Sequence, residues 1–163
     1  MENNELSFDS FIENVDPKYH DFVQQKHAYL ISLGCKLKLQ LAKNGYVVSY
    51  QHGKKKRVLL NYVFRKSGLH ARVYCDFISQ YMDVLEEAPE DIRKVIVKAP
   101  SCKRFENPPK CNSKCSGYVF TINGTQHQKC RYNCFLLEIN DASIPFINNL
   151  LENELKHRDL NAK

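Results

Sequence analysis

The sequence lacks the short motifs that mark the commonest enzyme classes. It has no glycine-rich loop for phosphates, no His-Glu-x-x-His, no Gly-x-Ser-x-Gly and no Cys-x-x-Cys. Each motif places a phosphate, a metal or a nucleophile in a defined turn or helix, so its absence excludes that familiar active site. A binding protein is therefore favoured over an enzyme.

Long apolar runs are also missing. No segment approaches the roughly 20 apolar residues that a membrane-spanning helix needs, and the chain opens with the polar MENNELSFDS instead of an apolar signal segment. The 163 residues are 43% hydrophobic and 26% charged, which suits one globular domain. We therefore expect a cytoplasmic protein with no membrane partner.

Acidic residues are absent between Cys35 and Cys75, where ten basic residues occur. Residues 1–21 show the reverse balance, with six acids and one base. Because a segregated positive field attracts phosphates, the pattern predicts a surface for nucleic acid or another polyanion. The residues expected to form this surface are Lys54, Lys55, Lys56, Arg57, Arg65 and Arg72.

Four aromatic side chains accompany this basic stretch, namely Tyr46, Tyr62, Phe64 and Tyr74. If they point outward, they can stack on bases. The alternative is that the lysines form a solvated strand face that prevents edge pairing, while the aromatic residues belong to the core.

Alternating apolar and polar residues around Asn44-Gly45 predict an antiparallel hairpin. With these two residues as the loop, Leu41 pairs with Val48, Leu39 with Tyr50 and Leu37 with His52. The leucines then share one face with Val48 and Tyr50, and the opposite face carries Lys36, Lys38, Gln40, Ser49 and Gln51. Two further strands, near residues 57–65 and 69–75, complete a four-stranded antiparallel meander over residues 35–75.

Helices are expected in residues 1–34, 76–100 and 143–158. Their start signals are Ser7, Asp16 before Pro17, Asp76, Pro89 and Ser143. In the last helix, Glu154 and Arg158 form an i, i+4 pair, which stabilises a helix by a few tenths of a kcal/mol.

Five of the seven cysteines lie between Cys102 and Cys134. Within this stretch, Asn123-Gly124 separates two β-prone runs and predicts a hairpin with a two-residue turn. The register places Ile122 opposite Thr125 and Gly117 opposite Cys130. Both cysteine pairs are therefore expected at the open end of the hairpin.

Two Cys-x3-Cys pairs separated by 14 residues suit tetrahedral zinc, although the commonest zinc ribbons have two residues between their cysteines. The expected ligands are Cys111, Cys115, Cys130 and Cys134, with Cys102 replacing Cys134 in the alternate set. Free or buried thiols and disulfides remain as alternatives, and the odd cysteine count disfavours disulfides. Cys35 and Cys75 are expected to be packed thiols.

The segment from Gly117-Tyr118 through Lys129-Cys130-Arg131-Tyr132 to Phe135 resembles a segment of small uncharacterised bacterial proteins. The preceding part of the chain resembles the YdhG-like family of domains of unknown function, some of which are proposed iron chaperones. The resemblance implies no assigned activity. It raises metal handling as an alternative function without identifying ligands for iron.

Together these patterns predict a single α+β domain over residues 1–163. A four-stranded antiparallel meander packs against helices, and residues 101–140 form a zinc-ribbon-like cysteine hairpin. The expected function is a binding or adaptor module with a structural zinc and a basic surface for nucleic acid or another polyanion. The alternative is a thiol-dependent redox or metal-trafficking protein, in which Cys102 beside Lys103 and Arg104 is the reactive thiol.

Overall fold

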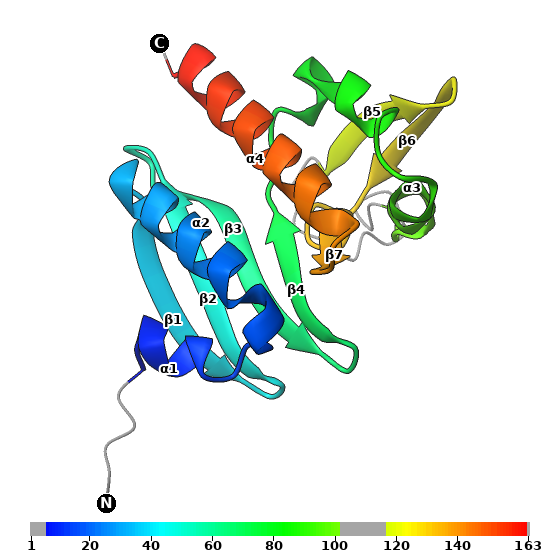
Figure 1. The fold of residues 1–163 in the computed structure, drawn as a ribbon. Coiled ribbons are helices and arrows are strands. Elements are labelled where there is room, and N and C mark those ends of the chain that lie inside the picture. Colours follow the sequence, from blue (N-terminus) through cyan, green and yellow to red (C-terminus); the bar gives the residue numbers. More distant parts are fainter. Residues whose placement is uncertain (1–5, 102–116, 163) are drawn as a thin grey trace, which may run out of the picture. The chain divides into compact units, whose positions relative to one another are not determined.

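The computed structural model describes residues 6–101 and 117–162, and Figure 1 shows its elements. The chain divides into two compact units. The N-terminal unit runs to Ala71 and also includes Glu138–Asn140, and the C-terminal unit comprises Arg72–Leu137 and the chain from Asp141 onward. The short segment Glu138–Asn140 thus belongs to a unit otherwise made from the first half of the chain.

The main sheet contains five antiparallel strands in the order β1-β2-β3-β4-β7. The predicted meander consists of β1 (Lys36–Ala42), β2 (Gly45–His52), β3 (Arg57–Arg65) and β4 (Gly68–Val73). The α+β class is confirmed, but the strand count of four is wrong, because β7 (Leu136–Glu138) pairs with the outer side of β4. Hydrogen bonds from Val73 N to Phe135 O (3.0 Å) and from Ile139 N to Leu69 O (2.9 Å) flank this strand.

The turn between β1 and β2 differs from its predicted position. The observed pairs are Leu41 with Tyr46, Leu39 with Val48 and Leu37 with Tyr50, and Lys43 and Asn44 form the turn. The predicted register is therefore wrong by two residues, because Gly45 is the first residue of β2, at a φ of 122°, and not part of the loop. Since side chains alternate with a period of two, the shift leaves each side chain on its predicted face.

The N-terminal helices α1 (Phe8–Ile12) and α2 (His20–Ser32) cover one face of β1, β2 and β3, and the 3₁₀ turn η1 (Pro17–Tyr19) joins them (Figure 1). Ser7 caps α1 as predicted, since its Oγ accepts a hydrogen bond from Ser10 N at 3.1 Å. Phe11 is fully buried and stacks on Tyr62 with ring centroids 5.8 Å apart. The first helix is thus fixed to the sheet by both its cap and its core residue.

A polar contact between His27 and Tyr50 joins α2 to the sheet. His27 stacks on Phe8 with ring centroids 3.7 Å apart, and its Nδ1 is 2.9 Å from the hydroxyl of Tyr50 on β2. Tyr50 is fully buried, and burial raises its pKa far above the ordinary range of a phenol. The hydroxyl therefore stays neutral, and its hydrogen bond to His27 satisfies a buried polar group.

The described part of the C-terminal unit combines short helices and a two-stranded hairpin with one long helix. Its elements include the 3₁₀ helices η2 (Ile78–Gln80) and η3 (Met82–Leu85), the helix α3 (Glu90–Lys98), the hairpin of β5 (Tyr118–Ile122) and β6 (Thr125–Lys129), and the long helix α4 (Ser143–Leu160). The α-helix predicted after Asp76 is wrong, because that segment forms two 3₁₀ turns. The helix predicted after Pro89 is confirmed as α3.

The β5–β6 hairpin has its predicted register. Ile122 pairs with Thr125 and Tyr118 with Lys129, and both turn residues, Asn123 and Gly124, have positive φ angles of 51° and 78°. These angles are those of the two-residue hairpin turn that Asn-Gly favours. The same dipeptide did not form this turn at Asn44-Gly45, where Asn44 lacks the positive φ of Asn123 and Gly45 already pairs with Ala42 as the first residue of β2.

Candidate functional site

The turn between β2 and β3 gathers three of the predicted anion-binding residues. Lys54, Lys55 and Lys56 are all exposed, and a hydrogen bond from Lys56 N to Gly53 O (3.1 Å) closes the turn. Lys56 has a φ of 50°, a conformation that few residues other than glycine adopt. The closed turn keeps three ammonium groups at one end of the hairpin.

A β-bulge lies next to this turn. Tyr50 pairs with Leu60 and Gln51 with Val58, so Leu59 is an extra residue on β3. Bulges increase the local twist of a strand pair and redirect the residues that follow. Beyond the bulge, Arg57 pairs with His52, which places Arg57 at the same end as the three lysines.

Two further lysines lie on β1, the edge strand of the sheet. Lys36 pairs with Gln51 and Lys38 with Ser49, and both lysines are exposed. We call Lys36, Lys38, Lys54, Lys55 and Lys56 the hairpin lysine cluster. Among the described residues, none of these five lysines forms an ion pair with an acid.

Arg65 and Arg72 lie away from this cluster. Arg65 is exposed at the last position of β3, at the opposite end of the β2–β3 hairpin from the Lys54 turn. Arg72 is only 1% exposed, its Nε donates to Tyr132 O at 2.6 Å, and its guanidinium lies 3.8 Å from the centre of the Tyr132 ring. Arg72 is thus a core residue of the C-terminal unit and does not belong to the exposed basic surface predicted for it.

The aromatic residues near the basic stretch divide into two groups. Tyr62 and Tyr74 are buried and belong to the core, as the alternative interpretation states. Tyr46 and Phe64 are half-buried, and each packs edge-on against Phe11, with ring centroids 6.3 and 6.0 Å apart. The structure therefore offers no exposed row of rings for stacking along this part of the sheet.

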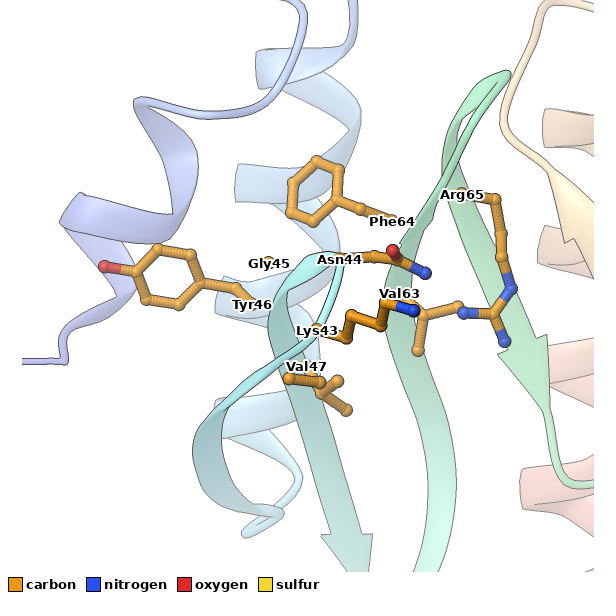
Figure 2. Close-up of a pocket in the computed structure, with 9 residues that line it drawn as sticks. Lys43, Asn44, Gly45, Tyr46, Val47, Val63, Phe64 and Arg65 are labelled. Atoms are coloured by element: carbon orange, nitrogen blue, oxygen red, sulfur yellow. The ribbon is translucent and has the colours of Figure 1, made fainter.

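A recess of about 220 Å³ lies beside the β1–β2 turn. We call it the turn recess, and residues 42–47 and 63–65 line it (Figure 2). In Figure 2 the side chains of Lys43 and Arg65 point toward one another near Val63. The turn recess is at the opposite end of β2 from the Lys54 turn, so it is a second basic site on the same unit.

The cysteine turn follows β6 directly. Cys130 and Cys134 lie in one turn, in which Cys134 N donates to Cys130 O at 2.9 Å and Asn133 Nδ2 lies 3.5 Å from Cys130 Sγ. Cys134 is fully buried and Cys130 is partly exposed. The other three expected ligands, Cys102, Cys111 and Cys115, lie outside the described residues.

The buried thiols of this unit are held neutral by their surroundings. Burial raises the pKa of Cys134 far above its usual range, and although the nearby Lys129 lowers it, Lys129 does not outweigh burial. Burial also raises the pKa of Cys75, which is fully buried as predicted, and the Glu154 carboxylate adds to this shift. Because the thiolate is the reactive form, neither residue is suited to nucleophilic or redox chemistry in this state.

Two basic residues near the cysteine turn have structural partners. The Lys129 ammonium donates to the carbonyl oxygens of Val97 (2.6 Å) and Ala99 (2.9 Å), at the C-terminal end of α3. A cation at this end of a helix satisfies unpaired carbonyl groups and complements the helix dipole. Arg131 donates from Nε and a terminal nitrogen to the two oxygens of Asp76, at 2.7 and 3.2 Å.

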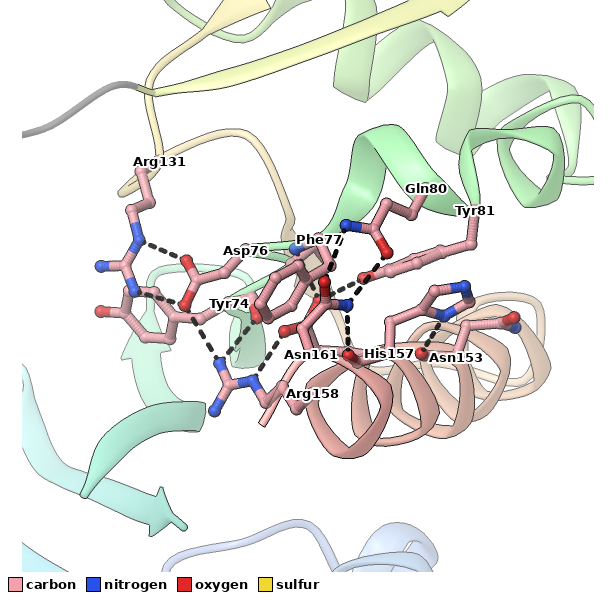
Figure 3. Close-up of polar contacts among 12 residues, drawn as sticks. Tyr74, Asp76, Phe77, Gln80, Tyr81, Arg131, Asn153, His157, Arg158 and Asn161 are labelled. Carbon is pink, nitrogen blue, oxygen red and sulfur yellow. Dashed lines mark hydrogen bonds and ion pairs between the residues drawn. The ribbon is translucent and has the colours of Figure 1, made fainter. Parts of the chain in front are cut away.

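A buried ion network connects α4 to the segment after β4 (Figure 3). Arg158 donates to Glu154 Oε2 at 2.6 Å, to Asp76 Oδ2 at 3.3 Å and to Tyr74 O at 3.2 Å. Glu154 Oε1 also accepts from the Tyr81 hydroxyl (2.7 Å) and from Phe77 N (3.0 Å). Glu154 is fully buried and Arg158 is 8% exposed, so the network is a structural tie.

The sequence itself indicates that Glu154 and Arg158 are buried, although the i, i+4 spacing of the pair does not. Ile147, Leu150, Leu151 and Leu155 are buried on α4, and Glu154 and Arg158 continue the same helical stripe at i+3 and i+4 intervals. Two charged residues within an apolar stripe must find partners in the core, because an unpaired buried charge costs several kcal/mol. The stabilisation of a few tenths of a kcal/mol that an exposed i, i+4 pair contributes therefore does not apply to Glu154 and Arg158.

Glu154 makes the stability of this unit depend on pH. Burial raises the pKa of Glu154 above the ordinary value of 4.5, and the hydrogen bonds from Arg158, Tyr81 and Phe77 N oppose the shift. A raised pKa means that the folded state favours the protonated acid. The contribution of this protonation to the free energy of unfolding is therefore fully present below about pH 4.5, and it is lost as the pH rises through the pKa of Glu154 in the folded protein. Glu154→Gln removes this titration.

We therefore expect Glu154→Gln to gain stability relative to the wild type as the pH is raised from about 4 to about 8. Urea unfolding curves of both proteins across this range measure the difference. A difference that is constant with pH, or that changes with the opposite sign, would contradict the assignment.

Comparison with protein-family models, curated proteins and solved structures found no significant match. Within residues 6–101 and 117–162, no three His, Cys, Asp or Glu side chains form a group that could hold a metal. In the same part of the chain, no helix is both long and apolar enough to cross a bilayer.

Proposed function

We propose that this protein is a cytoplasmic binding module that holds a polyanion, such as nucleic acid, on the hairpin lysine cluster. The observation that carries the proposal is the concentration of five exposed lysines on the edge strand β1 and in the adjacent β2–β3 turn, in a stretch of sequence without any acid. Like charges at this density repel one another, and bound phosphates would remove the repulsion. The zinc-stapled cysteine hairpin is the second part of the proposal.

The composition of the cluster favours contacts to phosphates over contacts to bases. Lysine is a flexible point charge, whereas base recognition relies on planar groups such as the guanidinium, or on stacking rings. Tyr62 and Tyr74 are buried, so they do not supply such rings. We therefore expect binding that depends strongly on salt and weakly on sequence.

The test is a triple substitution of Lys54, Lys55 and Lys56 by Gln. Each phosphate contact contributes about 0.7 to the slope of log K against log salt for a single strand, so the variant should lose about 2 from the slope. Fluorescence anisotropy with a labelled single-stranded oligonucleotide, measured over a series of NaCl concentrations, gives this slope for both proteins.

A charge-matched control separates the cluster from net charge. Lys94, Lys98 and Lys156 are exposed lysines of the C-terminal unit, and replacing them by Gln changes the net charge by the same amount. This control should keep the wild-type slope. Equal losses in the two triple variants, or no binding by the wild type, would refute the assignment of the site to the hairpin lysine cluster.

The zinc part of the proposal assigns Cys111, Cys115, Cys130 and Cys134 as ligands, with Cys102 as the alternate. Two observations support it: the β5–β6 hairpin has the expected register, and Cys130 and Cys134 share one turn at its base. A bound Zn²⁺ would stabilise the thiolate forms of these residues and join the two ends of the hairpin. A set of four cysteines leaves no open position, so the metal would be structural.

A further inference from the structure

The turn recess brings two cations together, and none of the described residues that line it is an acid. Lys43 and Arg65 come from the β1–β2 turn and from the last position of β3, and their side chains point toward one another in Figure 2. Within the described part of the chain, neither side chain forms an ion pair. Two converging positive charges repel, so an anion bound between them would stabilise this arrangement.

Apart from the amide of Asn44, the rest of the turn recess is mainly apolar, and neighbouring contacts hold its backbone in place. Val47 and Val63 are directly paired neighbours on β2 and β3 and lie beside the two cations. Tyr46 is tied to α1 by a hydrogen bond from its hydroxyl to Ser10 Oγ (2.9 Å). The site therefore combines two charged groups with an apolar wall on a backbone that is already in place, which lowers the cost of ordering on binding.

Gly45 allows the backbone at the end of the β1–β2 turn to lie close to the Phe64 ring of β3. Its φ is 122°, and a Cβ at this position would lie 3.3 Å from Cδ2 of Phe64. A larger residue would therefore strain the turn or displace the ring. Glycine thus lets the turn that carries Lys43 lie directly against β3.

We infer that the turn recess binds a small phosphomonoester, whose phosphate lies between Lys43 and Arg65 and whose apolar group contacts Val47 and Val63. A phosphomonoester carries a charge of about −1.5 to −2 at pH 7, which matches the two cations better than the single charge of a carboxylate. The guanidinium of Arg65 can hold two phosphate oxygens at once. A volume of about 220 Å³ is below the range of drug-sized pockets, so the ligand is small.

This inference does not depend on the proposed function. The turn recess and the Lys54 turn lie at opposite ends of β2, and the two sites share no residue. The ester has two possible sources: a free metabolite-sized compound, or the terminal phosphate of a nucleic acid strand. Both present the same dianionic group to Lys43 and Arg65.

The experiment is a calorimetric titration with phenyl phosphate, using inorganic phosphate and benzoate for comparison. The wild type should bind phenyl phosphate more tightly than either compound, because only phenyl phosphate has both the dianion and the ring. Lys43→Gln and Arg65→Gln should each weaken binding about tenfold, which is the loss expected for one charge-assisted hydrogen bond of about 1.4 kcal/mol. Binding should also weaken below about pH 6, where the phosphate takes up a proton.

The triple Gln variant of Lys54, Lys55 and Lys56 is the control, and it should bind phenyl phosphate as the wild type does. Both substituted residues of the turn recess are exposed, so circular dichroism should show an unchanged fold. No binding of phenyl phosphate by the wild type, or equal binding by the wild type and the variant carrying both Lys43→Gln and Arg65→Gln, would overturn the inference.

An oligonucleotide with and without a 5′-phosphate then identifies the source. A preference for the phosphorylated end that is lost with Lys43→Gln and Arg65→Gln assigns the site to a nucleic acid terminus. Binding of phenyl phosphate without such a preference assigns it to a free ester. In either case, failure of the salt-slope experiment would refute only the proposal that the hairpin lysine cluster binds a polyanion.

Discussion

Replacing Arg158 by Met is expected to lower the free energy of unfolding by about 3–5 kcal/mol at pH 7. The substitution removes the donor to Glu154 Oε2 and leaves a fully buried carboxylate without its countercharge. It also removes the bonds of Arg158 to Asp76 and to the carbonyl of Tyr74. Urea unfolding followed by circular dichroism measures the loss.

Two further variants separate this effect from the loss of packing. Glu154→Gln combined with Arg158→Met should recover part of the stability, because the amide oxygen can still accept from Tyr81 and Phe77 N while the unpaired charge is gone. Lys156→Met, at an exposed position of the same helix, should change stability by less than about 0.5 kcal/mol. Equal effects of Arg158→Met and Lys156→Met would show that the network does not stabilise the fold.

The loss in Arg158→Met should also decrease toward acid pH. Burial raises the pKa of Glu154, and removal of Arg158 raises it further, so the carboxyl becomes neutral as the pH falls. A neutral acid needs no countercharge. Unfolding curves near pH 4 should therefore show a smaller difference from the wild type than curves at pH 7.

Protein purified without added zinc is expected to carry one zinc per chain, and a strong chelator should lower its melting temperature by more than about 10 °C. The effect is large because a structural zinc contributes its binding free energy directly to folding. Elemental mass spectrometry gives the metal content, and thermal melts before and after chelation give the stability. A protein without metal, whose melt the chelator leaves unchanged, would refute the zinc site.

Single serine variants identify the ligands. Cys111→Ser, Cys115→Ser and Cys130→Ser should each lose zinc, whereas Cys35→Ser should keep it, since Cys35 is buried in the N-terminal unit. Loss of zinc in Cys102→Ser together with retention in Cys134→Ser would select the alternate ligand set. Metal content is the readout here, because a serine at the buried position of Cys134 lowers stability by itself.

The thiol-dependent alternative makes a different prediction about the cysteines. Its candidate nucleophile, Cys102, lies outside the described residues, while Cys75 and Cys134 are buried and neutral. A chain that reacts rapidly with a thiol reagent at one cysteine and keeps its fold afterwards would favour this alternative over a structural zinc.

Local sequence patterns determined the faces and the clearest turns of this protein. The alternation in residues 36–51 placed each side chain on its correct face even though the register was wrong by two. Asn123-Gly124 fixed the β5–β6 hairpin, since both turn residues adopt the positive φ angles that this dipeptide tolerates. These features depend only on neighbours along the chain, so the sequence alone carries them.

Tertiary structure alone decided which charges are buried and where the sheet ends. Strand β7 joins β4 across a long stretch of chain, and Arg72, Glu154 and Arg158 are buried because distant segments supply their partners. The convergence of Lys43 and Arg65 likewise needs the pairing of β2 with β3. Composition gave the sign of the charge, but packing between distant segments selected which charges face solvent and can bind an anion.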